Sequence, residues 1–186
     1  MNALFRRIIL TGFMGAGKTT VARALAARLG CAMLDTDDCI VERAGRSIEA
    51  IIDTEGEGRF RQIETEALRE ILERGSARVI ALGGGTWTIE ENRALIAAHD
   101  DCLSVWLDAP FALCWQRIAA NAPDTTAAAR PLARDRDRAH ALYTARRAAY
   151  KLAARHVRAG EERGAEDVAA EIASIIERQS FADERT

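Results

Sequence analysis

Short apolar runs alternate with longer amphipathic stretches along most of the chain. The apolar runs predict strands at Arg7–Leu10, Ala32–Leu34, Arg78–Leu82, Cys102–Leu107 and Arg155–Arg158. Between them, apolar residues at helical spacing predict helices at Gly17–Leu29, Gly58–Glu73, Glu90–Ala98, Pro110–Ala119, Asp137–Ala154 and Ala165–Arg178. This alternation favours an α/β fold in which helices cover both faces of a parallel sheet. Ligands of such folds bind at the carboxyl ends of the strands, so the segments that follow the strands are the candidate site.

Composition and charge narrow the class of protein. The chain has 186 residues, 48% of them hydrophobic and 29% charged, which is ordinary for one globular domain. The net charge of −2 provides no basic field for nucleic acid or an anionic membrane, so we expect neither as a partner. No stretch approaches the ~20 apolar residues of a membrane span, and the apolar run at the N-terminus is too short for a signal peptide. We therefore expect a cytoplasmic protein. We also expect a monomer.

The four cysteines have no C-x-x-C spacing, which makes a metal site or a disulfide a weak interpretation. They fit the pattern of small buried hydrophobic residues instead.

A glycine-rich segment directly follows the first predicted strand and opens the first predicted helix. Gly12-Phe-Met-Gly-Ala-Gly-Lys-Thr-Thr20 matches the phosphate-loop pattern G-x-x-x-x-G-K-[ST] in its strand–loop–helix setting. The glycines let successive backbone N–H groups point into one concavity, and the helix adds its positive dipole end. Lys18 supplies a mobile charge for the β- and γ-phosphates, and the Thr19 hydroxyl is the expected Mg²⁺ ligand. We predict that the chain binds ATP or a similar triphosphate through Gly15, Ala16, Gly17, Lys18, Thr19 and Thr20.

Two aspartates follow the second predicted strand. Asp35 and Asp37 are two residues apart, so in a strand they point to the same side. We predict that Asp35 helps to hold Mg²⁺, through water, and that Asp37 accepts hydrogen bonds from substrate hydroxyls. An aspartate here could instead cap the helix predicted at Cys39–Ala44. We assign that role to Asp38 and leave it open for Asp37.

Gly83-Gly84-Gly85 follows the third predicted strand, again at the ligand-bearing end. Three glycines let a ligand ring lie against the backbone and reach its N–H groups, although a plain turn would have the same composition.

The face of the predicted helix on which each arginine lies predicts different surroundings for Arg61, Arg146 and Arg147. Arg61 borders the inward stripe of its helix near the helix start, where it could also simply pair with Glu57 or Glu64. Arg146 lies within the inward stripe of Asp137–Ala154, and a buried arginine needs an anionic partner. The neighbouring Arg147 is rotated by about 100°, so we interpret it as a solvated surface charge.

The segment Asn121–Pro131 is small and polar and has no apolar period. An inert linker would look the same. We predict a lid over about residues 121–136, because phosphoryl-transfer enzymes must exclude water from the γ-phosphate. Arg130 lies in this segment and could swing onto phosphate oxygens.

Taken together, these residues resemble the shikimate kinase family. The match runs from about Ile8 to Tyr150, and its specificity comes from six motifs in order, the phosphate loop among them. These are Gly12–Thr19, Asp35-Thr36-Asp37, Gly56-Glu57 with Phe60-Arg61 and Glu64, Gly83-Gly84-Gly85, Arg130-Pro131-Leu132, and Arg146 four residues before Tyr150.

The resemblance implies a P-loop NTPase fold of the nucleoside monophosphate kinase type, with a five-stranded parallel sheet flanked by helices and a lid. It implies one kinase domain over residues 1–186, with a substrate-binding segment at about 35–73. The implied reaction transfers the ATP γ-phosphoryl group to the 3-hydroxyl of shikimate, in the chorismate and aromatic amino acid pathway, with Mg²⁺ as cofactor.

The resemblance also implies residue roles. Asp37 would hold the accepting hydroxyl, and Arg61 and Arg146 would clamp the substrate carboxylate. Gly83, Gly84 and Gly85 would line the pocket, and Arg130 would reach the phosphates from the lid. Lys18, Asp37 and Arg130 would thus be the catalytic residues.

The chain departs from the family's pattern at two places. Ala148 stands where the family usually has proline, and Ala133 stands where a second leucine is common. A kinase for another hydroxy acid, such as gluconate, is an alternative, but it would lack the glycine triplet and this arginine pair. A nucleotide-binding relative that has lost catalysis is a second alternative, although Lys18, Asp37 and Arg61 are all present.

Overall fold

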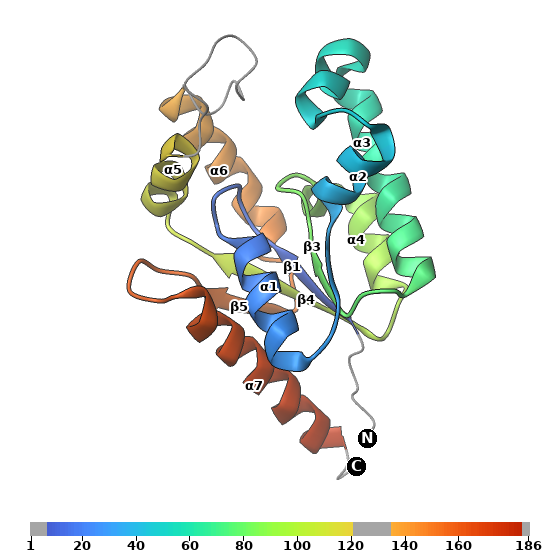
Figure 1. Ribbon diagram of the computed structural model, residues 1–186. Helices are drawn as coiled ribbons and strands as arrows, with labels where there is room; N and C mark the ends of the chain where they lie inside the picture. The colour runs from blue at the N-terminus through green and yellow to red at the C-terminus, as the bar shows by residue number, and fades with distance from the viewer. Residues whose placement is uncertain (1–6, 121–134, 184–186) are drawn as a thin grey trace.

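The computed structural model describes residues 7–120 and 135–183 (Figure 1). Its sheet has five strands, all parallel, in the order β2-β3-β1-β4-β5. The strands are β1 (Arg7–Thr11), β2 (Met33–Asp35), β3 (Val79–Ala81), β4 (Cys102–Asp108) and β5 (Arg155–Arg158). The predicted α/β fold with a five-stranded parallel sheet is therefore confirmed, and each predicted strand lies within about a residue of its observed position.

Helices flank the sheet. They are α1 (Lys18–Leu29), α2 (Thr36–Ala44), α3 (Ile48–Arg74), α4 (Glu90–Ala97), α5 (Phe111–Ala120), α6 (Arg136–Tyr150) and α7 (Ala165–Asp183), with a short 3₁₀ turn, η1, at Thr86–Thr88. Figure 1 shows α1 and α7 packed together across one face of the sheet. It also shows α2, α3 and α4 grouped at one side of the molecule and α5 and α6 at the other.

The main core lies between the sheet and its helices. The central strand β1 contributes Ile8, Ile9 and Leu10, all with no exposed surface. A strand covered by helices on both faces must be apolar at consecutive positions, which explains the continuous run in the sequence.

Helix α3 begins ten residues earlier than the sequence predicts. Ser47 caps it by accepting a hydrogen bond from the backbone N–H of Ala50 at 3.1 Å. Gly56 interrupts it with φ 84° and ψ 160°, a conformation outside the helical region. Ile51, in the part of the helix before this kink, belongs to a small second core with Ile40 and Phe60. Glycine at positions 56 and 58 disfavours helix, and for this reason the sequence pattern did not predict the first part of α3.

The four cysteines are free thiols: Cys114 is buried, and Cys31, Cys39 and Cys102 are half-buried. Within residues 7–120 and 135–183, no helix is long and apolar enough to cross a membrane.

The topology brings three predicted motifs to one edge of the sheet. The phosphate loop follows β1, Asp35 ends β2, and the glycine triplet follows β3. Because the three strands are parallel and adjacent, their carboxyl ends meet at the same edge.

Candidate active site

The loop after β1 has the backbone geometry of an anion cradle. Gly12, Gly15 and Gly17 have φ values of 143°, 75° and 93°, which disfavour any residue with a side chain. A Cβ on Gly12 would lie 2.8 Å from the Leu107 carbonyl oxygen, and one on Gly15 would lie 2.5 Å from that of Cys114. Helix α1 starts here without a side-chain cap, so its first N–H groups are available to an anion.

Lys18 is held inside this loop. Its Nζ donates hydrogen bonds to the carbonyl oxygens of Gly12 at 2.9 Å and Phe13 at 3.1 Å. Burial lowers the pKa of Lys18, and the charges of Asp37 and Asp35 act in the opposite direction. The ammonium group is thus placed where it can exchange carbonyl partners for phosphate oxygens.

Thr19 and Asp35 are in direct contact. The Thr19 hydroxyl donates a hydrogen bond of 2.6 Å to Asp35 Oδ2. The other carboxylate oxygen, Oδ1, accepts a 3.0 Å bond from the backbone N–H of Asp37. Asp35 is therefore the N-cap of α2, and our assignment of that cap to Asp38 is wrong. The helix begins at Thr36, directly after β2, which leaves Asp38 inside its first turn.

A hydroxyl and a carboxylate oxygen at one point are the hard oxygen ligands that Mg²⁺ prefers. In the described part of the chain, no group of three or more His, Cys, Asp or Glu side chains could hold a metal by itself. The Thr19–Asp35 pair fits a Mg²⁺ ion that takes most of its ligands from phosphates and water, as is usual for this metal in kinases.

The glycine triplet after β3 is surrounded by the three side chains predicted to bind substrate. A Cβ on Gly83 would overlap Asp37 Oδ1, and one on Gly85 would lie 2.5 Å from Arg61 Nη1. A Cβ on Gly84 would lie 3.9 Å from Arg146 Nη1. The structure thus brings Asp37 of α2, Arg61 of α3 and Arg146 of α6 together around three consecutive glycines.

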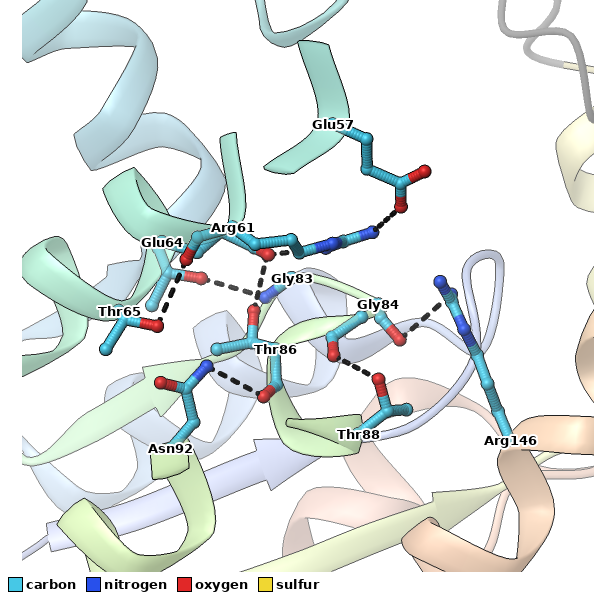
Figure 2. A network of polar contacts seen from close by, with 12 residues as sticks. Glu57, Arg61, Glu64, Thr65, Gly83, Gly84, Thr86, Thr88, Asn92 and Arg146 are labelled. Atoms are coloured by element: carbon cyan, nitrogen blue, oxygen red, sulfur yellow. Dashed lines mark hydrogen bonds and ion pairs between the residues drawn. The ribbon is translucent and has the colours of Figure 1, made fainter. Parts of the chain in front are cut away.

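Hydrogen bonds fix the backbone of the triplet. The Gly83 N–H donates to Thr36 Oγ1 at 2.8 Å, and the Thr88 hydroxyl donates to the Gly85 carbonyl at 2.6 Å. The Gly84 carbonyl accepts from Arg146 Nη1 at 3.2 Å (Figure 2) and from the Tyr150 hydroxyl at 2.6 Å. Burial raises the pKa of Tyr150 to about 12, so it remains a donor at neutral pH. The triplet is a turn, closed by the Thr86 N–H donating to the Gly83 carbonyl at 3.2 Å, and these bonds fix it as a platform of backbone.

Arg61 pairs with both nearby glutamates, an alternative that the sequence left open (Figure 2). Its Nη2 donates to Glu57 Oε1 at 2.8 Å, and its Nη1 forms an ion pair with Glu64. Glu64 is 2% exposed, and its second oxygen accepts a 2.7 Å bond from the Thr86 hydroxyl. Asn92 in turn donates to the Thr86 carbonyl at 3.0 Å. A buried chain of polar groups therefore fixes one side of the Arg61 guanidinium.

Arg147 is not a solvated surface charge, so that interpretation was wrong. Its Nη1 lies 3.0 Å from Asp108 Oδ1 and 2.7 Å from the Tyr143 hydroxyl, and its guanidinium lies 5.0 Å from the centre of the Trp106 ring. Helix phase places this residue to one side of Arg146, but the end of β4 occupies that side. These contacts anchor α6 to β4 and so set the position of Arg146.

Arg117 is a residue of this region that sequence reasoning missed. It lies in α5, and its Nη1 donates to the Gly15 carbonyl at 3.1 Å, beside Gly17. This places a cation against the phosphate loop. The two residues are far apart in the chain, and no local spacing pattern connects them.

The lid is predicted over about residues 121–136. Residues 121–134, with Arg130 and the Arg130-Pro131-Leu132-Ala133 run, lie outside the described residues, while Asp135 caps α6 and Arg136 begins it. The lid and the role of Arg130 stay predictions.

Comparison with known proteins adds independent information. A family model described as "Shikimate kinase" matches residues 14–177 of this chain. The chain is 43% identical over 147 residues to the shikimate kinase of Ruegeria pomeroyi, covering 77% of this chain and 71% of that protein. It is 41% identical over 175 residues to the shikimate kinase of Geobacter sulfurreducens, covering 92% and 91%.

A solved structure is similar over nearly the whole fold. The shikimate kinase from Acinetobacter baumannii in complex with shikimate has a TM-score of 0.81 to this chain at 34% sequence identity, covering 94% of each chain.

Proposed function

Because this chain belongs to the shikimate kinase family and carries the family's activity, we propose a specific reaction and division of roles for it. The reaction transfers the γ-phosphoryl group of ATP to the 3-hydroxyl of shikimate and gives shikimate 3-phosphate and ADP. One observation supports this most strongly. Asp37, Arg61 and Arg146 surround a glycine platform at the same sheet edge as the phosphate loop. A carboxylate-bearing ring with hydroxyl groups matches that arrangement of charges.

The phosphate loop binds the triphosphate in this proposal. Backbone N–H groups of Gly15, Ala16 and Gly17 and of the first turn of α1, including Thr19 and Thr20, bind the phosphate oxygens. Lys18 leaves its carbonyl partners and neutralises charge on the β- and γ-phosphates. Arg130 reaches the same phosphates from the lid.

Thr19 and Asp35 would hold Mg²⁺, Thr19 directly and Asp35 through water. A Mg²⁺ ion held there would supply positive charge against the negative charge that develops on the phosphates during transfer. The Asp35 carboxylate is positioned for this by its bond from the Asp37 N–H.

Shikimate lies on the glycine triplet with its carboxylate between Arg61 and Arg146. A planar guanidinium can bind a carboxylate through two parallel hydrogen bonds, so two arginines fix both position and orientation. Glu64 acts as a positioning residue, because its second oxygen is fixed by Thr86 and it cannot follow Arg61 if that side chain turns.

Asp37 aligns or deprotonates the 3-hydroxyl. Phosphoryl transfer needs a positioned nucleophile and stabilised charge more than it needs a strong base. Asp37 lies in the first turn of α2, between the triplet and the phosphate loop that carries Lys18. It can therefore hold the hydroxyl in line with the γ-phosphorus.

We propose further that the enzyme acts as a monomer in the cytoplasm, where ATP is abundant, without nucleic acid or membrane as a partner. The net charge of −2 supports the absence of a nucleic-acid partner.

An ADP-release assay with shikimate, quinate and gluconate side by side, each with Mg²⁺ and ATP, tests the proposed function. Shikimate should support turnover far above the other two acids. Equal or greater turnover with gluconate would contradict the proposal.

A further inference from the structure

Glu57 and Glu64 contact the same guanidinium but are held very differently. The Glu64 side chain is 2% exposed and also bonds Thr86, whereas the Glu57 side chain is 68% exposed. Glu57 Oε1 accepts from Arg61 Nη2 at 2.8 Å. In Figure 2 this contact lies at the end of the Arg61 guanidinium that is turned toward Arg146. Glu57 therefore occupies the side of Arg61 that a substrate carboxylate would need.

The charges around Glu57 agree with this geometry. Its pKa is lowered, first by the hydrogen bond from Arg61 and by that residue's charge, and further by the charges of Arg146 and Arg138. The Glu57 carboxylate thus lies in the field of both arginines of the proposed clamp. It is an anion at the place where the proposed substrate has one.

Glycines flank Glu57 on both sides. Gly56, before Glu57, has the non-helical φ and ψ that kink α3, and Gly58 comes directly after Glu57. Among the described residues, a Cβ on either glycine would meet no atom within 4 Å. The space beside the two glycines is open, so a local change of backbone dihedral angles at Gly56 can withdraw Glu57 from Arg61 without disturbing the second half of α3.

Arg61 carries one positive charge and already pairs with two carboxylates, those of Glu57 and Glu64. A third carboxylate attracted by Arg61 and Arg146 would have to compete with the first two for the N–H groups of Arg61, and Glu64 is fixed by burial. We propose that Glu57 is a displaceable internal ligand of Arg61, which holds the guanidinium in its binding position until the carboxylate of the substrate replaces it. This inference rests on the proposed function for the identity of the incoming acid.

Displacement has a measurable cost to substrate affinity. Exposed ion pairs contribute little each, so removing the competing charge should tighten shikimate binding about two- to five-fold. Glu57→Gln keeps the size and the carbonyl oxygen of the side chain but removes its charge. We expect the dissociation constant for shikimate, measured by calorimetry, to fall by this factor, while the KM for ATP stays unchanged.

Glu55→Gln is the matched control. Glu55 is also a partly exposed glutamate of α3, but it pairs with Arg46 and Arg59 rather than Arg61. This variant should bind shikimate as the parent does. A Glu57→Gln variant that binds shikimate equally or more weakly would overturn the inference, because Glu57 would then be a support for the clamp and not a competitor.

A second comparison ties the effect to Arg61. In an Arg61→Ala background, adding Glu57→Gln should leave kcat/KM for shikimate unchanged, since there is no guanidinium left to compete for. A gain that persists without Arg61 would also overturn the inference. A parent that binds no shikimate would contradict the proposed function itself. A parent that binds it while Glu57→Gln gives no gain contradicts only the role of Glu57.

Discussion

Arg61 and Gly85 lie so close together that a Cβ on Gly85 would be 2.5 Å from Arg61 Nη1. The two residues come from α3 and from the loop after β3, and the guanidinium occupies the space that any side chain at position 85 would take. The last glycine of the triplet therefore does more than expose backbone N–H groups to a ligand. It makes room for one half of the proposed carboxylate clamp.

Gly85→Ala should displace Arg61 and raise the KM for shikimate about tenfold, because a lost charge-assisted hydrogen bond typically costs about 1.5–3 kcal/mol of binding free energy. The φ of −104° at Gly85 suits alanine, so backbone strain would not contribute. Steady-state kinetics with both substrates varied in turn measure the effect. Gly160→Ala serves as a control, since a Cβ there would meet none of the described atoms within 4 Å. An unchanged KM in Gly85→Ala would show that Arg61 does not need its present position.

Arg61→Ala and Arg146→Ala should each raise the KM for shikimate more than that for ATP. Loss of a charge-assisted hydrogen bond typically costs about 1.5–3 kcal/mol, which corresponds to about 10- to 100-fold. Calorimetric titration with shikimate checks whether binding itself changes. If both variants bound shikimate as well as the parent does, the clamp assignment would be wrong.

Asp37→Asn should lower turnover by about 100-fold or more while ATP binding stays largely intact, because the amide cannot accept the hydroxyl proton. The Asp37 N–H that bonds Asp35 is unchanged by this substitution, so the cap of α2 should be retained. Rapid-quench measurement of a single turnover separates the chemical step from product release. Turnover near that of the parent would remove Asp37 from the mechanism.

Much of this site follows from the sequence because its motifs follow parallel strands. Once β1, β2 and β3 are recognised as neighbours, Lys18, Asp35 and Gly83 must meet at one sheet edge. The contacts of Arg147 could not be predicted in this way. Helix phase says which way a side chain points, but only the packed structure shows that Asp108 and Trp106 are there to receive it.

The cap of α2 was misassigned for a related physical reason. Asp35, Asp37 and Asp38 are equally good capping residues, so composition alone cannot choose among them. The choice depends on where β2 ends, and element boundaries are the least reliable part of a pattern-based prediction. The first part of α3 was missed because Gly56 and Gly58 oppose helix locally, while burial of Ile51 in the second core stabilises it.

Acid should weaken the fold through the ion pair of Asp101 with Arg7. Arg7 is the first residue of β1, at the end of the strand opposite the phosphate loop. Arg7 donates to Asp101 Oδ1 at 2.6 Å and Oδ2 at 3.1 Å, and this hydrogen bonding lowers the pKa of Asp101 below its ordinary 3.8. A carboxylate whose pKa is lower in the folded state stabilises it fully above the unfolded pKa and loses that effect as the pH falls through the folded pKa. Asp101→Asn should therefore be less stable than the parent at pH 7, by on the order of 1 kcal/mol.

The difference between Asp101→Asn and the parent should shrink as the pH is lowered below about 4. Urea unfolding at a series of pH values measures it, and Asp100→Asn, which changes the exposed neighbour, is the control. A difference that stayed constant down to pH 2 would show that the Arg7–Asp101 pair has no part in acid sensitivity.

The identity of the phosphorylated product tests the central claim most directly. The purified protein is incubated with Mg²⁺, ATP and shikimate as the sole acceptor, and the product is assigned by two-dimensional ¹H–³¹P NMR. We predict one phosphomonoester whose phosphorus couples to the proton on C3 of the ring, formed in equal amount to ADP. A phosphate on another hydroxyl, or ADP release without any phosphorylated acid, would contradict the account.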